Sequence, residues 1–206
     1  MDRYGSPKCP HTNAVLIAAG EKGVDINSHV EDDWGPSSSI RSMSPLGIGP
    51  VLKDRSAVNI GVVSCMSYLD DKGFGPSLVH RNGVTRARMF QEITIAQQTD
   101  CSDDAALAAA LDQLEATLNS PLGNMKGDYC VGQYTLADCA WAGVCQVATN
   151  MGKGTAVSSR SAVNTWFAAV QSHPSTSKEA INPFSCLSTK ADHDSNSMRD
   201  VRINTA

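Results

Sequence analysis

Cys9 is the residue whose position most favours chemistry, because it stands directly before Pro10 at the start of an expected amphipathic helix. Proline is favoured at the first helical position, where its missing N–H costs nothing, so Cys9 falls at the N-cap. Free N–H groups and the helix dipole stabilise an anion there, which lowers the pKa of a cysteine thiol below its ordinary value. We therefore predict that Cys9 is a nucleophilic thiolate. The alternative is a capping thiol without chemistry.

Two neighbours of Cys9 define this chemistry further. His11 lies in the first helical turn and would help to stabilise a thiolate if it were charged, and a neutral surface histidine is the other interpretation. Thr12 stands three places after Cys9, where a dithiol motif would have a second cysteine. Any redox cycle of Cys9 must therefore be monothiol, with an external thiol resolving the mixed disulfide.

The other cysteines show no site pattern. The chain has 7 cysteines, with no Cys-x-x-Cys pair and no cysteine–histidine spacing typical of zinc. We expect no metal, and a reducing compartment in which most of these thiols act as small hydrophobic side chains. Three lie on helices predicted to be buried and are expected to be inert: Cys65, Cys139 and Cys145. Three lie in or near predicted loops: Cys101, Cys130 and Cys186.

Composition excludes several classes of partner. The chain has 206 residues and a formal net charge of -4, with both signs interspersed, so no basic surface for nucleic acid or an anionic membrane is expected. The longest apolar runs are far shorter than the roughly 20 residues of a membrane span, and the N-terminus lacks an apolar signal segment. These observations predict a cytoplasmic protein without a membrane or nucleic-acid partner.

The N-terminal third alternates between strand and helix signals. Residues 3–6 predict a strand, 10–22 a helix ended by Gly23, and 24–30 a second strand. After a loop over 32–39, residues 51–58 predict a hairpin and 60–71 a helix. This order predicts a parallel strand pair joined by a crossover helix, with an antiparallel hairpin at one edge.

Beyond a polar, glycine-rich linker the strand signals disappear. The pattern predicts helices over 84–99, 105–118, 135–150 and 162–172. The third of these is mostly apolar, so we expect it to be central, and Thr135 and Asp138 predict a capping box at its start. From residue 182 the composition is polar, which predicts a disordered tail.

Four stretches resemble the cytosolic glutathione transferases, in that family's order. They are YGSPKCP with the helix after it, SPLGIGPVL, YLDDK and GQYTLAD, which begin at residues 4, 44, 68 and 132. The resemblance implies an α/β domain of thioredoxin-like βαβαββα order over 1–73, a linker over 74–83 and an all-helical domain over 84–181. The tail is then 182–206.

The Cys9-Pro10 pair also resembles particular branches of that family. It is similar to the omega, lambda and dehydroascorbate-reductase branches, in which the cysteine attacks a disulfide or accepts glutathione as a mixed disulfide. Beta-class enzymes have a cysteine here without the proline, and some of them conjugate. The resemblance thus implies glutathione as co-substrate and Cys9 as the catalytic residue of thiol transfer, or of conjugation to a small electrophile.

The same resemblance implies a glutathione site. Pro50 resembles the family's cis-proline, which would turn the Gly49 backbone toward an extended peptide such as glutathione. Ile60-Gly61 stands where the family has a Glu-Ser or Gln-Ser pair that holds the γ-glutamyl carboxylate. Neither residue has a side-chain donor, so their backbone N–H groups would face the anion, while Asn59 would cap the helix and offer an amide.

An acceptor site and other functions follow from the remaining residues. We expect His11 to contact the acceptor, together with Met89, Phe90 and Ile93 on the helix after the linker, for which ordinary packing is the alternative. Relatives of this fold dimerise, and a homodimer is expected. Two other hypotheses stay open: a non-catalytic interaction module, and a specialised isomerase or lyase of one metabolite.

Overall fold

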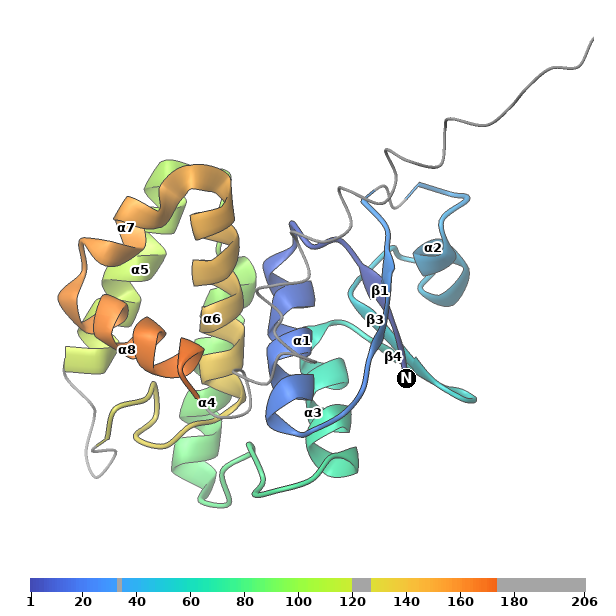
Figure 1. The fold of residues 1–206 in the computed structure, drawn as a ribbon, viewed down its shortest axis with the longest axis horizontal. Helices are drawn as coiled ribbons and strands as arrows, with labels where there is room; N and C mark the ends of the chain where they lie inside the picture. The colour runs from blue at the N-terminus through green and yellow to red at the C-terminus, as the bar shows by residue number, and fades with distance from the viewer. Residues whose placement is uncertain (33–34, 120–126, 174–206) are drawn as a thin grey trace, which may run out of the picture.

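A four-stranded mixed sheet forms one side of the molecule (Figure 1). The computed structural model describes residues 1–32, 35–119 and 127–173. The strands run in the order β2-β1-β3-β4, and their bounds are β1 (Asp2–Gly5), β2 (Asn27–Val30), β3 (Val51–Asp54) and β4 (Ala57–Ile60). The β1–β2 pair is parallel and the two other pairs are antiparallel. The predicted parallel pair with a hairpin at one edge is therefore confirmed.

Helices α1 (Pro10–Glu21) and α3 (Val62–Lys72) lie side by side on the face of the sheet that points toward the rest of the chain (Figure 1). A short α2 (Ser39–Met43) completes the βαβαββα order that the family resemblance implies. The residue pattern predicted a loop over 32–39 and no element over 40–43, because five residues are too few to show a helical period. The N-cap of α2 is Ser38, whose hydroxyl accepts the Arg41 N–H.

The end of α1 explains why β2 begins later than predicted. Gly23 has φ +61°, the left-handed conformation expected of a helix-stopping glycine. The Val24 N–H then bonds to the Ala19 carbonyl at 2.9 Å and the Gly23 N–H to the Gly20 carbonyl at 3.1 Å. Val24 thus belongs to the helix stop, and the strand starts only at Asn27.

The rest of the described chain is helical. It consists of α4 (Gly83–Gln98), α5 (Asp104–Asn119), α6 (Leu136–Ala148), the π-helical segment η1 (Thr149–Lys153), α7 (Gly154–Ser158) and α8 (Ser161–Gln171). Helix α6 lies against α1, with α5, α7 and α8 on its far side (Figure 1). Every residue of α6 is buried, which confirms its predicted central place.

The start of α6 has the predicted capping box. Thr135 is its N-cap, and the Asp138 carboxylate accepts the Thr135 backbone N–H at 2.9 Å. The same carboxylate accepts the Cys130 N–H at 3.0 Å and the Trp166 indole N–H at 2.9 Å. Asp138 therefore joins α6 to α8 and to the segment before α6.

Among the residues that the structure describes, no helix is long and apolar enough to cross a membrane. The same residues hold no group of three or more histidine, cysteine, aspartate or glutamate side chains arranged to bind a metal ion. The tail predicted over 182–206 lies outside the described residues, as does the predicted helical domain beyond residue 173.

Candidate functional site

Cys9 is the N-cap of α1, as predicted, with Pro10 at the first helical position. Its carbonyl accepts the N–H groups of Thr12 and Asn13, which begin the helix. The Asn13 side-chain amide also donates to the carbonyls of Pro7, at 2.8 Å, and Cys9, at 3.0 Å. The loop before α1 is thus fixed to the first helical turn, and the Cys9 side chain remains partly exposed.

The surroundings of Cys9 favour the thiolate. Burial alone would raise the pKa of Cys9, but a hydrogen bond and charge from His11, with smaller contributions from Thr12, outweigh it and lower this pKa. Reciprocally, the hydrogen bond to Cys9 raises the pKa of His11 despite the opposing effect of burial. The two side chains therefore stabilise each other as a thiolate and an imidazolium.

Thr12 brings a buried hydroxyl to the same place. Its side chain is fully buried, and its hydroxyl has no hydrogen-bond partner within normal distance and geometry. A Cβ on Gly5 would clash with this hydroxyl and would lie 3.5 Å from the Pro50 ring. Thr12 therefore lies against Gly5 at the end of β1, and Pro50 lies close to the same glycine. In the sequence, Thr12 is informative only as the position where a second cysteine is absent.

The Gly49–Pro50 peptide is cis, as the family resemblance implies, and both residues are buried at the start of β3. The Pro50 carbonyl accepts the Gly61 N–H at 2.9 Å. We expected the Gly61 N–H to face an anion, and this was wrong, because the hydrogen bond to Pro50 already uses it. Ile60 belongs to β4 and pairs with Val51.

The expected role of Asn59 as a helix cap was also wrong. The N-cap of α3 is Gly61, at φ +82°, without a side-chain cap, and Asn59 lies two residues earlier in β4. The Asn59 amide nitrogen is buried without a hydrogen-bond partner, and its oxygen lies 3.5 Å from the Ser64 hydroxyl. Ser64, exposed in the first turn of α3, was missed by the sequence analysis although it stands in the predicted helix start.

His11 connects the Cys9 loop to the helical region. Its Nε2 lies 3.1 Å from the carbonyl oxygen of Gln97, in the last turn of α4. The α1 turn is also close to α6, because a Cβ on Gly143 would clash with the Pro10 carbonyl and lie 2.9 Å from the Ala14 nitrogen. Cys9 and His11 are thus positioned by both regions of the fold.

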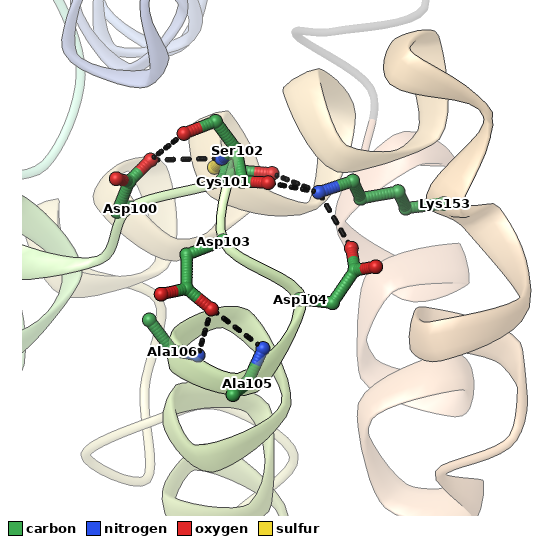
Figure 2. A network of polar contacts seen from close by, with 8 residues as sticks. All are labelled: Asp100, Cys101, Ser102, Asp103, Asp104, Ala105, Ala106 and Lys153. Atoms are coloured by element: carbon green, nitrogen blue, oxygen red, sulfur yellow. Dashed lines mark hydrogen bonds and ion pairs between the residues drawn. The ribbon is translucent and has the colours of Figure 1, made fainter.

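The connection between α4 and α5 is held by Lys153. Its ammonium donates to the carbonyls of Cys101, at 2.8 Å, and Ser102, at 2.7 Å, and lies 2.7 Å from the Asp104 carboxylate (Figure 2). The Asp103 carboxylate accepts two N–H groups at the start of α5. These contacts fix the chain that leaves α4 just after the carbonyl that His11 contacts.

The three residues of α4 that were expected to contact the acceptor differ in their burial. Met89 and Ile93 are fully buried in the hydrophobic core, where α4 packs against α6, which fits the packing alternative. Phe90 packs only partly against that core and keeps some exposure. Of the three, Phe90 is the one that is not fully buried.

The other described cysteines are buried free thiols, which fits the inert role expected of three of them. Burial raises the pKa of Cys65 to about 12 and that of Cys101, where the charge of Asp100 adds to it, to about 11. Burial also raises the pKa values of Cys130, Cys139 and Cys145. Cys186 lies outside the described residues. Cys9 is thus the one cysteine among the described residues whose pKa is lowered.

Two curated relatives are similar to parts of this chain, and no protein-family profile matches it. A stringent starvation protein A homolog of Coxiella burnetii is 32% identical over 43% of this chain and 42% of its own. A stringent starvation protein A homolog of Pasteurella multocida is 27% identical over 63% of this chain and 66% of its own. The matches therefore span less than two thirds of either relative's length.

Solved structures cover nearly the whole chain. A maleylacetoacetate isomerase from Methylobacterium extorquens, crystallised with malonate and glutathione, matches 89% of this chain and 96% of its own at a TM-score of 0.74 and 17% identity. A delta-class glutathione transferase of Nilaparvata lugens matches 89% of this chain and 95% of its own, at a TM-score of 0.71 and 23% identity. With the sheet order and the helices described above, these likenesses show that the chain has the glutathione transferase fold.

Proposed function

We propose that this chain is a glutathione-dependent transferase whose nucleophile is Cys9. The observation that carries the proposal is the partly exposed Cys9 at the start of α1, whose thiol has a lowered pKa. A lowered pKa increases the fraction of thiolate at a given pH, and the thiolate is the reactive form of cysteine. Solved structures of the same fold that contain glutathione support the choice of co-substrate.

The residues around Cys9 fit glutathione in part. In this proposal Gly49 and Pro50 line its peptide backbone, and the first turn of α3, after Gly61, offers helix-start N–H groups to its γ-glutamyl carboxylate. The Ser64 hydroxyl and the unpartnered Asn59 amide lie at the same end of α3. Exposed Ile48 and Ile60 give this side an apolar wall. We infer that the carboxylate is held by backbone and by these two polar groups.

Thiol transfer is then an exchange that balances at sulfur. The Cys9 thiolate attacks the glutathionyl sulfur of a mixed disulfide, forms a Cys9–glutathione disulfide and releases the acceptor's thiolate. A glutathione thiolate next attacks the glutathionyl sulfur on Cys9, which releases the Cys9 thiolate and forms glutathione disulfide. The second glutathione is required because residue 12 is threonine, so the chain has no resolving cysteine in the motif. Phe90 is our candidate for contact with the acceptor.

The proposal is tested by glutathione-dependent reduction of hydroxyethyl disulfide. We expect turnover by the protein as it stands, complete loss in Cys9→Ser, and full activity in Cys130→Ala, which removes a buried thiol instead. Calorimetric titration of Cys9→Ser with glutathione checks binding without covalent trapping. Transfer that survives in Cys9→Ser overturns the role of Cys9. Absence of both turnover and glutathione binding overturns the whole proposal and favours a non-catalytic module.

A second candidate reaction is isomerisation, favoured by the likeness to a maleylacetoacetate isomerase. It is distinguished by incubating the protein with glutathione and maleylacetoacetate and following the change in ultraviolet absorbance. Conjugation is assayed in parallel with a nitroaryl chloride, because a serine hydroxyl can still hold the glutathione thiolate and so conserve conjugation in Cys9→Ser. Sedimentation of the same samples tests the homodimer that we propose.

A further inference from the structure

We propose that His11 is a second catalytic residue, which accepts the proton of the Cys9 thiol while the Gln97 carbonyl of α4 holds its other ring nitrogen. The inference rests on the proposed function of Cys9 and deepens it. It replaces the expected role of His11 as an acceptor contact with a role at the reacting sulfur itself.

The hydrogen-bond partners of His11 define its tautomer. A carbonyl oxygen only accepts, so the contact of 3.1 Å between Nε2 and the Gln97 oxygen requires the hydrogen to be on Nε2. In the neutral ring Nδ1 is then unprotonated, and it is the nitrogen left to accept the proton of the Cys9 thiol, which stands two residues earlier at the N-cap of the same helix. The interaction with Cys9 raises the pKa of His11. The arrangement is therefore a thiol, a base and an orienting acceptor in sequence.

Two helix ends favour the charges that this proton transfer creates. Cys9 caps the N-terminus of α1, where the dipole is positive and stabilises a thiolate. Gln97 lies in the last turn of α4, whose carbonyls form the negative end of that helix and stabilise an imidazolium. The two helix ends meet at this pair. The start of α1 therefore stabilises the negative thiolate, and the end of α4 stabilises the positive imidazolium.

Few other described polar groups lie around the Cys9–His11 pair, and the solvent exposure of each one decides how strongly it affects the charge on Cys9. Lys8 and Asp32 face each other at 3.9 Å beside the Cys9 loop, with side chains 81% and 54% exposed, so solvent screens both. In the α4–α5 connection, the buried Cys101 thiol also interacts with Cys9, because a charge on Cys9 contributes to the raised pKa of Cys101. The buried Thr12 hydroxyl is placed to donate to the thiolate once it forms. His11 is therefore the main partner of the Cys9 charge.

The proposed step conserves every proton. The Cys9 S–H bond breaks, its proton goes to Nδ1 of His11, and the sulfur keeps the electron pair with which it attacks the disulfide. The sulfur–sulfur bond of the substrate then breaks, and its electron pair leaves with the released thiolate. His11 returns the proton from Nδ1 to this thiolate and is neutral again.

The experiment measures the pH dependence of Cys9 alkylation by iodoacetamide, followed by mass spectrometry of the Cys9 peptide. In His11→Gln we expect the thiol pKa to rise by at least one unit, so that alkylation near pH 6 slows about tenfold or more. His29→Gln, which removes an exposed histidine of β2, is the matched control and should leave the profile unchanged. An unshifted profile in folded His11→Gln overturns the inference.

A second measurement needs no substitution at His11. Coupling is reciprocal, so the imidazole pKa followed by NMR should fall in Cys9→Ser by about the amount by which His11 lowers the thiol pKa. A purely structural histidine would not show this shift, and an imidazole pKa that is unchanged in Cys9→Ser also overturns the inference. Neither readout uses glutathione, so loss of the coupling and failure of thiol transfer are told apart.

Discussion

Asp138 shows how much one carboxylate does when it is fully buried. One oxygen accepts the Cys130 N–H and the Trp166 indole N–H, and the other accepts the backbone and hydroxyl hydrogens of Thr135. Burial raises the pKa of Asp138, and these donors offset only part of the shift. A raised carboxyl pKa means that the folded state binds the proton more tightly than the unfolded state. The corresponding stability is complete at low pH and is lost as the pH rises through the folded-state pKa.

We predict that Asp138→Asn lowers the free energy of unfolding by about 1–3 kcal/mol, because the new amide nitrogen cannot accept the Thr135 N–H. The difference in the free energy of unfolding between Asp138→Asn and the unchanged protein should become smaller as the pH rises. The Asp138 carboxyl titrates and loses its contribution, whereas the asparagine amide does not titrate. Urea unfolding at several pH values measures both effects. Asp112→Asn, which changes a carboxylate that is 70% exposed in its pair with Arg160, is the control. Its cost should stay under about 1 kcal/mol, and equal costs for the two variants would contradict the prediction.

Single residues also show how far the sequence predicts this site. Cys9 at the N-cap and the Thr135–Asp138 box were predictable because each depends on neighbours within three residues. The contact between His11 and Gln97 was not predictable. It uses a backbone oxygen 86 residues away, and the type of side chain at residue 97 does not indicate such a contact. The N-cap of α3 was predicted at Asn59 but lies at Gly61. The reason is that β4 extends to Ile60, so strand pairing decides where the helix can begin.

At the scale of elements, the close approach of α1 and α6 positions the thiol. Gly143 is the residue that permits it, because a Cβ there would clash with the Pro10 carbonyl and crowd the Ala14 nitrogen. Neither of these is a flexible side-chain end that can move away cheaply, and α1 and α6 both contribute buried residues to the same hydrophobic core, where close packing leaves little room. Any added atom must therefore shift the first turn of α1, which bears Cys9.

Gly143→Ala should accordingly lower the free energy of unfolding by about 1–3 kcal/mol, the usual cost of an overpacked core. It should also change the rate of Cys9 alkylation, because His11 and the helix start move with the turn. Gly83→Ala at the start of α4 is the matched control: a Cβ there meets nothing within 4 Å, so we expect little change or slight stabilisation. Paired urea titrations and alkylation assays measure both effects, and equal results for the two variants would contradict the prediction.

Element length explains which helices the sequence predicts. Helices α4 and α5, each of 16 residues, have enough turns for a period and were predicted within two residues of their observed ends. Helices α2 and α7 have 5 residues each and show no period; α2 was expected only from the family resemblance, and α7 was missed. The predicted helix over 135–150 ends earlier, at Ala148, and a π-helical segment follows in which Gly152 adopts φ +79°. Short and irregular segments are set by tertiary packing, which periodicity does not report.

At the scale of the whole molecule, one buried ion pair fixes the path between the sheet and the helices. The Lys22 ammonium lies 3.0 Å from the Asp70 carboxylate, with side chains 2% and 4% exposed, and donates to the Pro76 carbonyl. Asp70 also accepts the Leu78 N–H at 2.7 Å, and the Leu78 carbonyl accepts the N–H of Leu136 at the start of α6. We propose that this chain of contacts joins two domains across a linker over 74–83.

The sign of the Asp70 shift predicts how acid affects this joint. Burial alone would raise the pKa of Asp70, but the Leu78 N–H, the Ser77 hydroxyl and Lys22 outweigh it, so this pKa is lowered. Stability from Asp70 is therefore present above the ordinary carboxyl pKa and is lost as the pH falls through the folded-state value. Asp138 changes stability in the opposite direction, so acid should loosen the linker while it leaves the capped start of α6 intact.

Lys22→Met tests this joint, because it removes the cation and leaves the Asp70 carboxylate buried without its countercharge. We predict a loss of about 3–5 kcal/mol in the free energy of unfolding, as for other broken buried pairs. In Lys22→Met/Asp70→Asn the orphaned charge is gone, and the oxygen of the new side-chain amide can still accept the Leu78 N–H, so part of the loss should be recovered. Lys8→Met, at an exposed pair, is the control with little effect. If the double variant is no more stable than Lys22→Met, the cost lies in lost packing of the lysine chain, and the ion pair does not fix the linker.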